Sequence, residues 1–190
     1  MPYSDMLLRP AQPEDALAVA GVHVRSWQAA YRNILPEDYL SQLRPEDRAA
    51  KYDFASRDPL KPQTIVAVEE EENPAVHRSA IIMGFATVMP VTDSEMPGYG
   101  ELCALYVDPP QWGQGIGVAL LSAARAQMLE QGLRHAILWV LTGNVRAERF
   151  YQHHGWAADG IRRKATVWDI EVDEIRYARP LEAPSSSRKL

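Results

Sequence analysis

The sequence predicts an α/β protein in which a mixed sheet is flanked by helices on both faces. Short runs rich in β-branched and apolar residues, typical of strands, alternate with longer segments whose apolar residues recur at helical spacing. Their order is one strand, a group of helices, three strands, a helix, a strand, a helix and two strands, without an internal repeat. This order favours one sheet covered by helices.

The bulk composition excludes several classes of protein. Of the 190 residues, 46% are hydrophobic and 24% are charged, as in ordinary soluble globular proteins. This length fits one domain, expected at residues 1–181, before a disordered tail at residues 182–190. A formal charge of -5 argues against nucleic-acid binding, which needs a basic face. The single cysteine, and the lack of a membrane-length apolar run or a secretory pattern, predict a cytoplasmic protein without a membrane partner.

The first third of the chain is expected to form one strand and three helices. An apolar segment, residues 6–8, predicts a strand that stops at Pro10, which cannot donate to a ladder. Three Pro-Glu-Asp triplets follow, and each places proline in a first helical turn and two carboxylates at the positive end of the helix dipole. The triplets begin at Pro13, Pro36 and Pro45. The predicted helices cover residues 15–34, 36–43 and 45–56.

The remainder is expected to alternate strands with two helices. Pro109 and Pro110 end the strand before the first of these helices, because proline continues neither a ladder nor a helix. Gly132 is a natural C-cap for that helix, and Asn144 caps the next one. The expected strands cover residues 64–69, 80–89, 101–107 and 136–141, with an exposed loop at residues 70–79. A final hairpin is expected from residues 167–170 and 174–178.

The most informative segment is a glycine-rich turn, Trp112-Gly113-Gln114-Gly115-Ile116-Gly117, between a strand and a helix. Successive amides without bulky Cβ atoms can converge there on one anionic group at the positive end of the helix, which predicts a phosphate site. A P-loop would need Gly-Lys-Ser/Thr at the helix start, and the chain has Gly117-Val118. A dinucleotide site would need a third small residue and an acidic residue after the next strand, which are also lacking.

This turn resembles the pyrophosphate loop of the GCN5-related N-acetyltransferase (GNAT) family, Gln/Arg-x-x-Gly-x-Gly/Ala, with Trp112 at the Gln/Arg position. The downstream run Asn144-x-x-Ala147-x-x-Phe150-Tyr151 and the strand before the turn are also similar to the family pattern. The resemblance spans residues 6–181 and implies a mostly antiparallel sheet of six to seven strands. It also implies transfer of an acetyl group from acetyl-CoA (coenzyme A), without a metal, to a primary amine of a small-molecule or peptide acceptor that attacks directly in a ternary complex.

The resemblance also implies which residues hold the cosubstrate. Main-chain groups of the strand before the turn would hold pantetheine, with the Val107 amide as the oxyanion donor. Main-chain amides of the turn would hold the pyrophosphate, so Trp112 is expected to cost a side-chain contact rather than the site. The strand residues are Leu105, Tyr106 and Val107. The other residues are Trp112, Gly113, Gln114, Gly115, Ile116, Gly117, Asn144, Ala147 and Tyr151.

Two residues are candidates for proton transfer. Tyr151 lies two helical turns after Asn144 and therefore on the same face, and the resemblance assigns it the reprotonation of the CoA thiolate. Glu101 is six residues before Val107, hence on the same side of a regular strand, and is the leading candidate for a base that acts through a water molecule. The alternative for Glu101 is a solvated glutamate at a strand end, and the alternative for Tyr151 is a core tyrosine.

The acceptor would bind near the first helix if the resemblance holds. His23, Trp27 and Tyr31 recur every four residues and could form an aromatic wall for a cationic amine. A stripe of core aromatics has the same spacing, and this alternative carries somewhat more weight.

Three further features are interpreted as structural. His153 and His154 are adjacent, so they point in different directions on a helix and cannot share a metal ion. Cys103 is expected to be a buried strand residue rather than a nucleophile. The basic run at residues 162–164 is expected to be a solvated loop, with proximity to the CoA 3'-phosphate as the alternative.

Two other functions stay open at this point. A non-catalytic acyl-CoA-binding or sensing module would use the same glycine turn, and so would a nucleotide-binding module. The resemblance also allows a homodimer, although no residue of the sequence demonstrates one.

Overall fold

A computed structural model describes residues 6–69 and 81–181. In this part of the chain, the strands form one seven-stranded sheet in the order β1-β2-β3-β4-β5-β7-β6. All neighbouring strands are antiparallel except β4 and β5. The strands are β1 (Met6–Pro10), β2 (Gln63–Glu69), β3 (Ile82–Pro90), β4 (Tyr99–Val107), β5 (His135–Leu141), β6 (Ala157–Val167) and β7 (Ile170–Pro180). The mixed, mostly antiparallel sheet that was predicted is confirmed.

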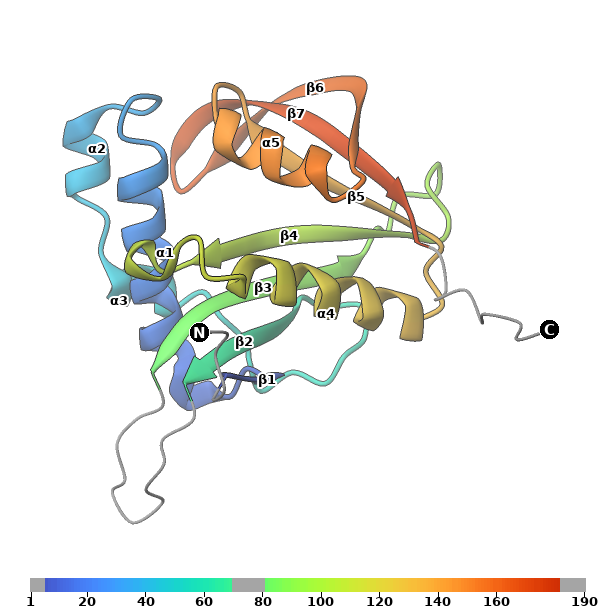
Figure 1. Ribbon diagram of the computed structural model, residues 1–190, viewed down its shortest axis with the longest axis horizontal. Coiled ribbons are helices and arrows are strands. Elements are labelled where there is room, and N and C mark those ends of the chain that lie inside the picture. The colour runs from blue at the N-terminus through green and yellow to red at the C-terminus, as the bar shows by residue number, and fades with distance from the viewer. Residues whose placement is uncertain (1–5, 70–80, 182–190) are drawn as a thin grey trace, which may run out of the picture.

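Helices cover both faces of the sheet (Figure 1). On β2, Val66 and Val68 pack with α1, whereas Ala67 between them packs in the cluster that contains α4. Because side chains alternate between the two faces of a strand, the two helices lie on opposite faces. The helices are α1 (Ala16–Ala30), α2 (Glu37–Ser41), α3 (Pro45–Ala49), α4 (Ile116–Glu130) and α5 (Val145–His153). Short 3-10 turns cover Pro13–Asp15 and Pro109–Gln111.

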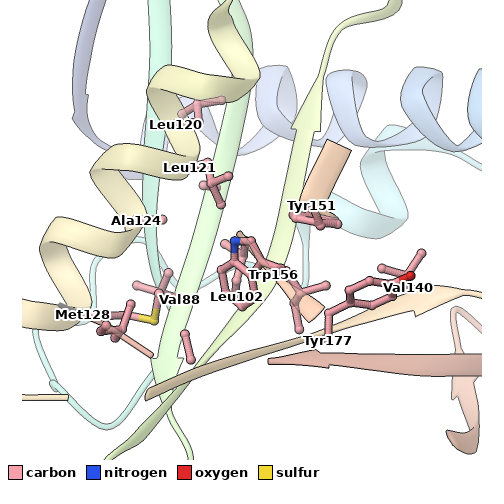
Figure 2. Close-up of a cluster of buried hydrophobic side chains, with 14 of the residues drawn as sticks. Val88, Leu102, Leu120, Leu121, Ala124, Met128, Val140, Tyr151, Trp156 and Tyr177 are labelled. Carbon is pink, nitrogen blue, oxygen red and sulfur yellow. The ribbon is translucent and has the colours of Figure 1, made fainter. Parts of the chain in front are cut away.

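The largest hydrophobic cluster lies between the sheet and the pair α4 and α5. Figure 2 shows four α4 side chains, Leu120, Leu121, Ala124 and Met128, in this cluster with Val88 and Leu102 from the sheet. Tyr151 from α5 and the following Trp156 are buried in the same cluster. This packing holds the start of α4 and the whole of α5 at fixed positions on one face of the sheet.

A β-bulge interrupts β4 at Cys103. Thr87 of β3 pairs with Ala104, and the next residue of β3, Val88, pairs with Leu102, so Cys103 is left without a partner. On its other edge, β4 pairs with β5 only as far as Glu101. The two parallel neighbours separate beyond that point, as Figure 1 shows. Bulges commonly bend a strand and end its pairing, and this one coincides with the place where β4 leaves β5.

Several element boundaries differ from the sequence prediction. Helix α1 ends at Ala30, before the predicted residue 34, because Tyr31 accepts turn bonds from the amides of Ile34 and Leu35 ahead of Pro36. Helices α2 and α3 are also shorter than predicted. The predicted loop at residues 70–79 and tail at residues 182–190 lie outside the described residues.

The predicted strand at residues 167–170 is wrong, because Val167 ends β6, Ile170 begins β7 and the two residues between them form the turn of a hairpin. Trp168 and Asp169 have φ of 50° and 63°, as expected for a two-residue hairpin turn between β6 and β7. Strand β6, which contains the basic run at residues 162–164, was missed and replaces the predicted loop. It is an edge strand with almost no buried residue, so its sequence lacks the apolar alternation of a half-buried strand.

Candidate active site

A cleft of about 510 Å³ occupies the space where β4 and β5 separate, and we call it the strand cleft. Its walls come from β4, β5 and α1, and from α5 and the glycine turn that precedes α4. All the residues predicted to hold the cosubstrate line it except Gln114, whose side-chain amide donates to the Pro110 carbonyl oxygen at 3.2 Å and to Gln111 at 3.1 Å. Gln114 therefore offers this cleft no side chain.

The glycine turn has the backbone that its sequence suggests. Gly113 and Gly115 have φ of 80° and 85°, in the left-handed region that favours glycine, and Gly115 is the N-cap of α4. A Cβ atom on either residue would meet no other atom within 4 Å, so the space in front of both is open. The amides at the start of α4 can thus face an anion in the cleft.

Two side chains fix the end of β4 at the carbonyl of Val107. The Ser26 hydroxyl donates to this oxygen at 3.0 Å, and the Trp112 indole N–H donates to it at 2.7 Å. The next amide, that of Asp108, donates to Met83 of β3 at 2.8 Å. Because successive amides of a strand point to opposite edges, the Val107 N–H points away from β3 and towards the strand cleft.

A smaller cavity of about 140 Å³ lies beside the strand cleft, and we call it the side cavity. Its lining residues are Trp27, Tyr31, Glu101, Cys103, Tyr106, Trp139, Leu141, Arg163, Val167 and Glu174. Those shared with the strand cleft are Tyr31, Cys103, Tyr106, Trp139 and Leu141. The two cavities therefore have a common wall at the bulge of β4 and the end of β5.

The bulge corrects the expected orientation of Glu101. Leu102 belongs to the cluster on the α4 face and Val107 packs against it, although in a regular strand two residues five positions apart would face opposite sides. The extra residue, Cys103, reverses the alternation of faces, so Glu101 lies on the opposite face from Val107. The prediction that these two residues share a side of the strand is wrong. Glu101 instead lines the side cavity together with Tyr106.

Charged groups surround Glu101 in the side cavity. Burial and the nearby Glu174 carboxylate raise the pKa of Glu101, whereas the Arg163 guanidinium lowers it. Arg163 donates to Glu174 at 2.7 Å, and its guanidinium carbon lies 3.9 Å from the centre of the Trp139 ring. Two carboxylates thus lie near one guanidinium, so the side cavity carries an excess of negative charge that favours binding of a cationic ligand.

Sequence reasoning missed Arg163, Glu174 and Trp139. Arg163 was assigned to a loop, and the other two were assigned to strands without a functional role. Their only signal is that charged residues sit opposite each other on β6 and β7, where Arg163 pairs with Glu174. The sequence alone does not give this register, which is set by the hairpin of β6 and β7 in the structure.

Tyrosine side chains meet between the two cavities. The Tyr106 hydroxyl accepts a hydrogen bond from the Trp27 indole at 3.1 Å, and the Tyr31 side chain lies near it in the same cavity wall. Tyr151 is buried in the wall of the strand cleft, and burial raises the pKa of its hydroxyl well above 10. Its helix begins at Asn144, whose side-chain oxygen accepts the Ala147 amide at 3.2 Å, which confirms the predicted cap. Tyr151 is therefore a protonated phenol at neutral pH.

The aromatic stripe of α1 divides into a cavity wall and a core residue. Trp27 and Tyr31 line the side cavity, but His23 lines neither cavity. Its ring is buried against Phe85, and its Nδ1 lies 2.9 Å from the Tyr52 hydroxyl. The prediction that His23 contributes to an acceptor wall is therefore wrong, because α1 turns this residue into the core.

Cys103 differs from its predicted environment. It was expected to be buried, but its side chain is accessible along both cavities. The surrounding protein and the Glu101 charge nevertheless raise the pKa of its thiol to about 12. At neutral pH Cys103 is a thiol rather than a thiolate, which agrees with the interpretation that it is not a nucleophile.

The described residues contain neither a membrane-spanning helix nor a cluster of metal-binding side chains. No helix there combines the length and the apolarity that crossing a membrane requires. Within residues 6–69 and 81–181, no group of three or more His, Cys, Asp or Glu side chains is placed to hold a metal ion.

The fold defines a class of protein. The crystal structure of PaiA N-acetyltransferase from Thermoplasma acidophilum, solved with coenzyme A, superposes with a TM-score of 0.69 at 19% identity, over 92% of this chain and 98% of that one. The Salmonella typhimurium protein yncA, solved with its cofactor acetyl-CoA, gives a TM-score of 0.65 at 18% identity, over 96% and 99% of the two chains. This class is the N-acetyltransferase fold.

Sequence comparison assigns the family. The model of the Acetyltransferase (GNAT) family matches residues 27–156. An uncharacterized N-acetyltransferase of Bacillus subtilis, YuaI, is 36% identical over 138 residues, which is 72% of each protein. The chain therefore belongs to the GNAT family and is an acyltransferase, as the sequence motifs predicted.

We expect His23 to make the protein less stable as the pH falls. Burial, and then the Arg48 charge, hold its pKa well below the ordinary 6.5 in the folded state. Below about pH 6.5 the unfolded chain therefore binds a proton that the folded chain does not, and the free energy of unfolding falls by at most about 1.4 kcal/mol per pH unit. Urea denaturation between about pH 7.5 and 5.5 measures this slope.

A His23→Gln variant is the control for this prediction. Glutamine retains a polar group near Tyr52 but does not titrate, so its unfolding free energy should change less over the same range. If the two proteins show parallel pH profiles, His23 is not the group responsible.

Proposed function

We propose that the chain transfers an acetyl group from acetyl-CoA to a primary amine that attacks directly while both substrates are bound. The observation that carries this proposal is the common wall of the two cavities. The strand cleft has an anion-binding turn at one end, and the side cavity holds a buried carboxylate. A thioester in the first cavity and an amine in the second would meet at that wall.

The strand cleft fits coenzyme A. The open space in front of Gly113 and Gly115 suits a diphosphate against the main-chain amides. The edge of Leu105–Val107 that faces the strand cleft suits pantetheine, because β5 does not pair with it there. Its N–H groups can bond a ligand, whereas the Val107 carbonyl already accepts from Ser26 and Trp112. Asn144 and Ala147 would form the opposite wall. Acetyl-CoA supplies an activated acyl group, and the protein has to orient and polarise it.

The Val107 N–H is the proposed donor to the thioester carbonyl. Its strand is held at the adjoining carbonyl by Ser26 and Trp112, so the donor does not have to reorganise during the reaction. A fixed donor that faces developing negative charge lowers the barrier by about 2.7–4 kcal/mol in the oxyanion hole of a serine protease.

Glu101 is the proposed base, with a water molecule between it and the amine. An alkyl amine with a pKa of about 10 is protonated at neutral pH and must lose a proton before it attacks. Burial of Glu101 raises its pKa, which makes it a better proton acceptor than an exposed glutamate. The aromatic rings of Trp27 and Tyr31 and the second carboxylate, Glu174, would attract the cationic form of the amine into the side cavity.

Tyr151 is the proposed acid. It lines the strand cleft as a buried, protonated phenol, and it can donate a proton to a departing thiolate. The positive end of α5 lies on the same side of this cleft and would stabilise negative charge there.

The proposed activity predicts thiol release from acetyl-CoA in the presence of amines. A thiol reagent would follow release with a polyamine, an aminoglycoside, an amino acid, a peptide and a lysine derivative. Release with at least one amine is expected. Tight CoA binding without release would favour a non-catalytic binder, and saturable ATP or NAD binding without CoA competition would favour a nucleotide module.

Variants at Gly115 test the anion site in the same assay. Glutamine and glutamate have nearly the same size and the same backbone strain at this left-handed position, but only Gly115→Glu adds a negative charge. Its CoA affinity should be lower than that of Gly115→Gln by roughly tenfold or more. Equal affinities would remove the diphosphate from this turn.

A Glu101→Gln variant is expected to lower kcat/KM by roughly 10²- to 10⁴-fold, the usual contribution of a general base. A base acts when deprotonated, so wild-type activity should fall as the pH drops through the pKa of Glu101, which lies above 4.5. Protonation of the amine also lowers activity at low pH, in both proteins. The additional loss of activity caused by protonation of Glu101 should be missing from the variant.

The matched control is Glu171→Gln, which changes an exposed carboxylate on β7 that pairs with Lys164 outside both cavities. An unchanged rate for Glu101→Gln would show that another group is the base.

A Tyr151→Phe variant should reduce kcat by roughly 10²-fold or more and leave the CoA dissociation constant within about twofold. The ring would keep its packing against Phe150 and Trp156, and only the hydroxyl is lost. Turnover and calorimetric CoA binding would be measured on the same preparation. Wild-type turnover would exclude Tyr151 as the acid.

A further inference from the structure

A cation that has no acidic partner in the described part of the chain lines the strand cleft. Arg146, in the first turn of α5, lines this cleft, and its guanidinium carbon is 3.4 Å from the centre of the Trp112 ring. Among the described residues, no carboxylate is within ion-pair distance of it. Arg25, a cation of α1 near the same turn, differs in this respect, because it forms an ion pair with Asp108 at 2.8 Å.

The position of Arg146 is unfavourable for a cation in the absence of a ligand. The first turn of a helix is the positive end of its dipole, where anions are stabilised and cations are not. Arg146 is exposed overall, but the partial burial of its guanidinium lowers its pKa, and no acidic side chain of the described residues offsets this effect. The Trp112 ring compensates for part of the cost through its electron-rich face. An anionic ligand beside the guanidinium would offset the rest.

The neighbouring residues indicate where this ligand would bind. Trp112 is fixed by its hydrogen bond to Val107 and directly precedes Gly113, the first glycine of the turn. A guanidinium whose face lies over an indole keeps its N–H groups at the edge, where they can donate to oxygen. Arg146 therefore adds a charged donor to a site that otherwise consists of main-chain amides.

We propose that Arg146, supported by the Trp112 ring, binds the diphosphate of coenzyme A across from the glycine turn. This inference rests on the proposed function, because it assigns one more contact to the same cosubstrate. The side-chain contact expected to be lost because Trp112 occupies the Gln/Arg position of the family pattern is then supplied by Arg146, a cation of α5 that the Trp112 ring positions. The Trp112 indole serves two purposes, as its N–H fixes β4 and its face holds Arg146.

Calorimetric titration with CoA and with dephospho-CoA tests the proposal. Dephospho-CoA retains the diphosphate but lacks the 3'-phosphate, so it separates the two sources of phosphate. We expect Arg146→Gln to weaken both ligands by roughly tenfold to a hundredfold, as for loss of a charge-assisted hydrogen bond. Arg149→Gln, one turn further along α5, is exposed and lines neither cavity, and it should stay within about twofold of wild type.

Three outcomes would overturn the proposal. Unchanged affinity of Arg146→Gln for both ligands would remove Arg146 from the site. Weaker binding of CoA alone would assign Arg146 to the 3'-phosphate, and equal losses in the Arg149→Gln control would indicate a general effect of charge. A wild-type protein that binds neither ligand would contradict the proposed function itself, which distinguishes that failure from the other three.

Two further variants keep the test informative. If Arg146→Gln does not fold, Arg146→Lys replaces it, and its affinity should be several-fold weaker because lysine retains the charge without the planar stack. Trp112→Leu should weaken CoA binding in the wild-type background and have a smaller effect in an Arg146→Gln background. Additive losses would show that the ring and the guanidinium act independently, against the proposal.

Discussion

The β-bulge at Cys103 is the constraint on which the candidate site depends. The pairing of β4 with β5 ends beside this one unpaired residue, where the strand cleft lies between the two strands. The same residue reverses the alternation of side chains, so that β4 presents Leu105 and Val107 to one face and Glu101 and Tyr106 to the other. A regular strand could not provide a free main-chain edge and a carboxylate beside it in this arrangement.

Much of the fold could be predicted because its signals are local. The glycine turn, the Asn144 cap and the prolines after β4 each specify backbone geometry within a few residues, and all three have the structure that was expected. Strand β6 and the bulge could not be predicted. The former is exposed on both sides, and the latter is determined by the register with β3, which a single sequence does not contain.

The candidate site could likewise be predicted only in part. The main chain of the cleft follows from the motif, but the side cavity is assembled from α1, β4, β5 and the β6–β7 hairpin. Arg163 and Glu174 become neighbours only through that hairpin. His23 shows the converse difficulty, because its spacing matches that of Trp27 and Tyr31 although it faces the core. Helical periodicity identifies a buried stripe without separating core residues from cavity walls.

The two cavities differ in charge on either side of one strand. The glycine turn offers amides and the start of a helix, with Arg146 beside it, whereas the side cavity offers Glu101 and Glu174 against a single guanidinium. An anionic carrier and a cationic amine would therefore each be attracted to one cavity and repelled from the other. Because β4 forms the wall between them, the proposed substrates would each be disfavoured in the wrong cavity without a separate gate. The charges that select the two substrates would thus also bring their reactive ends to the same wall.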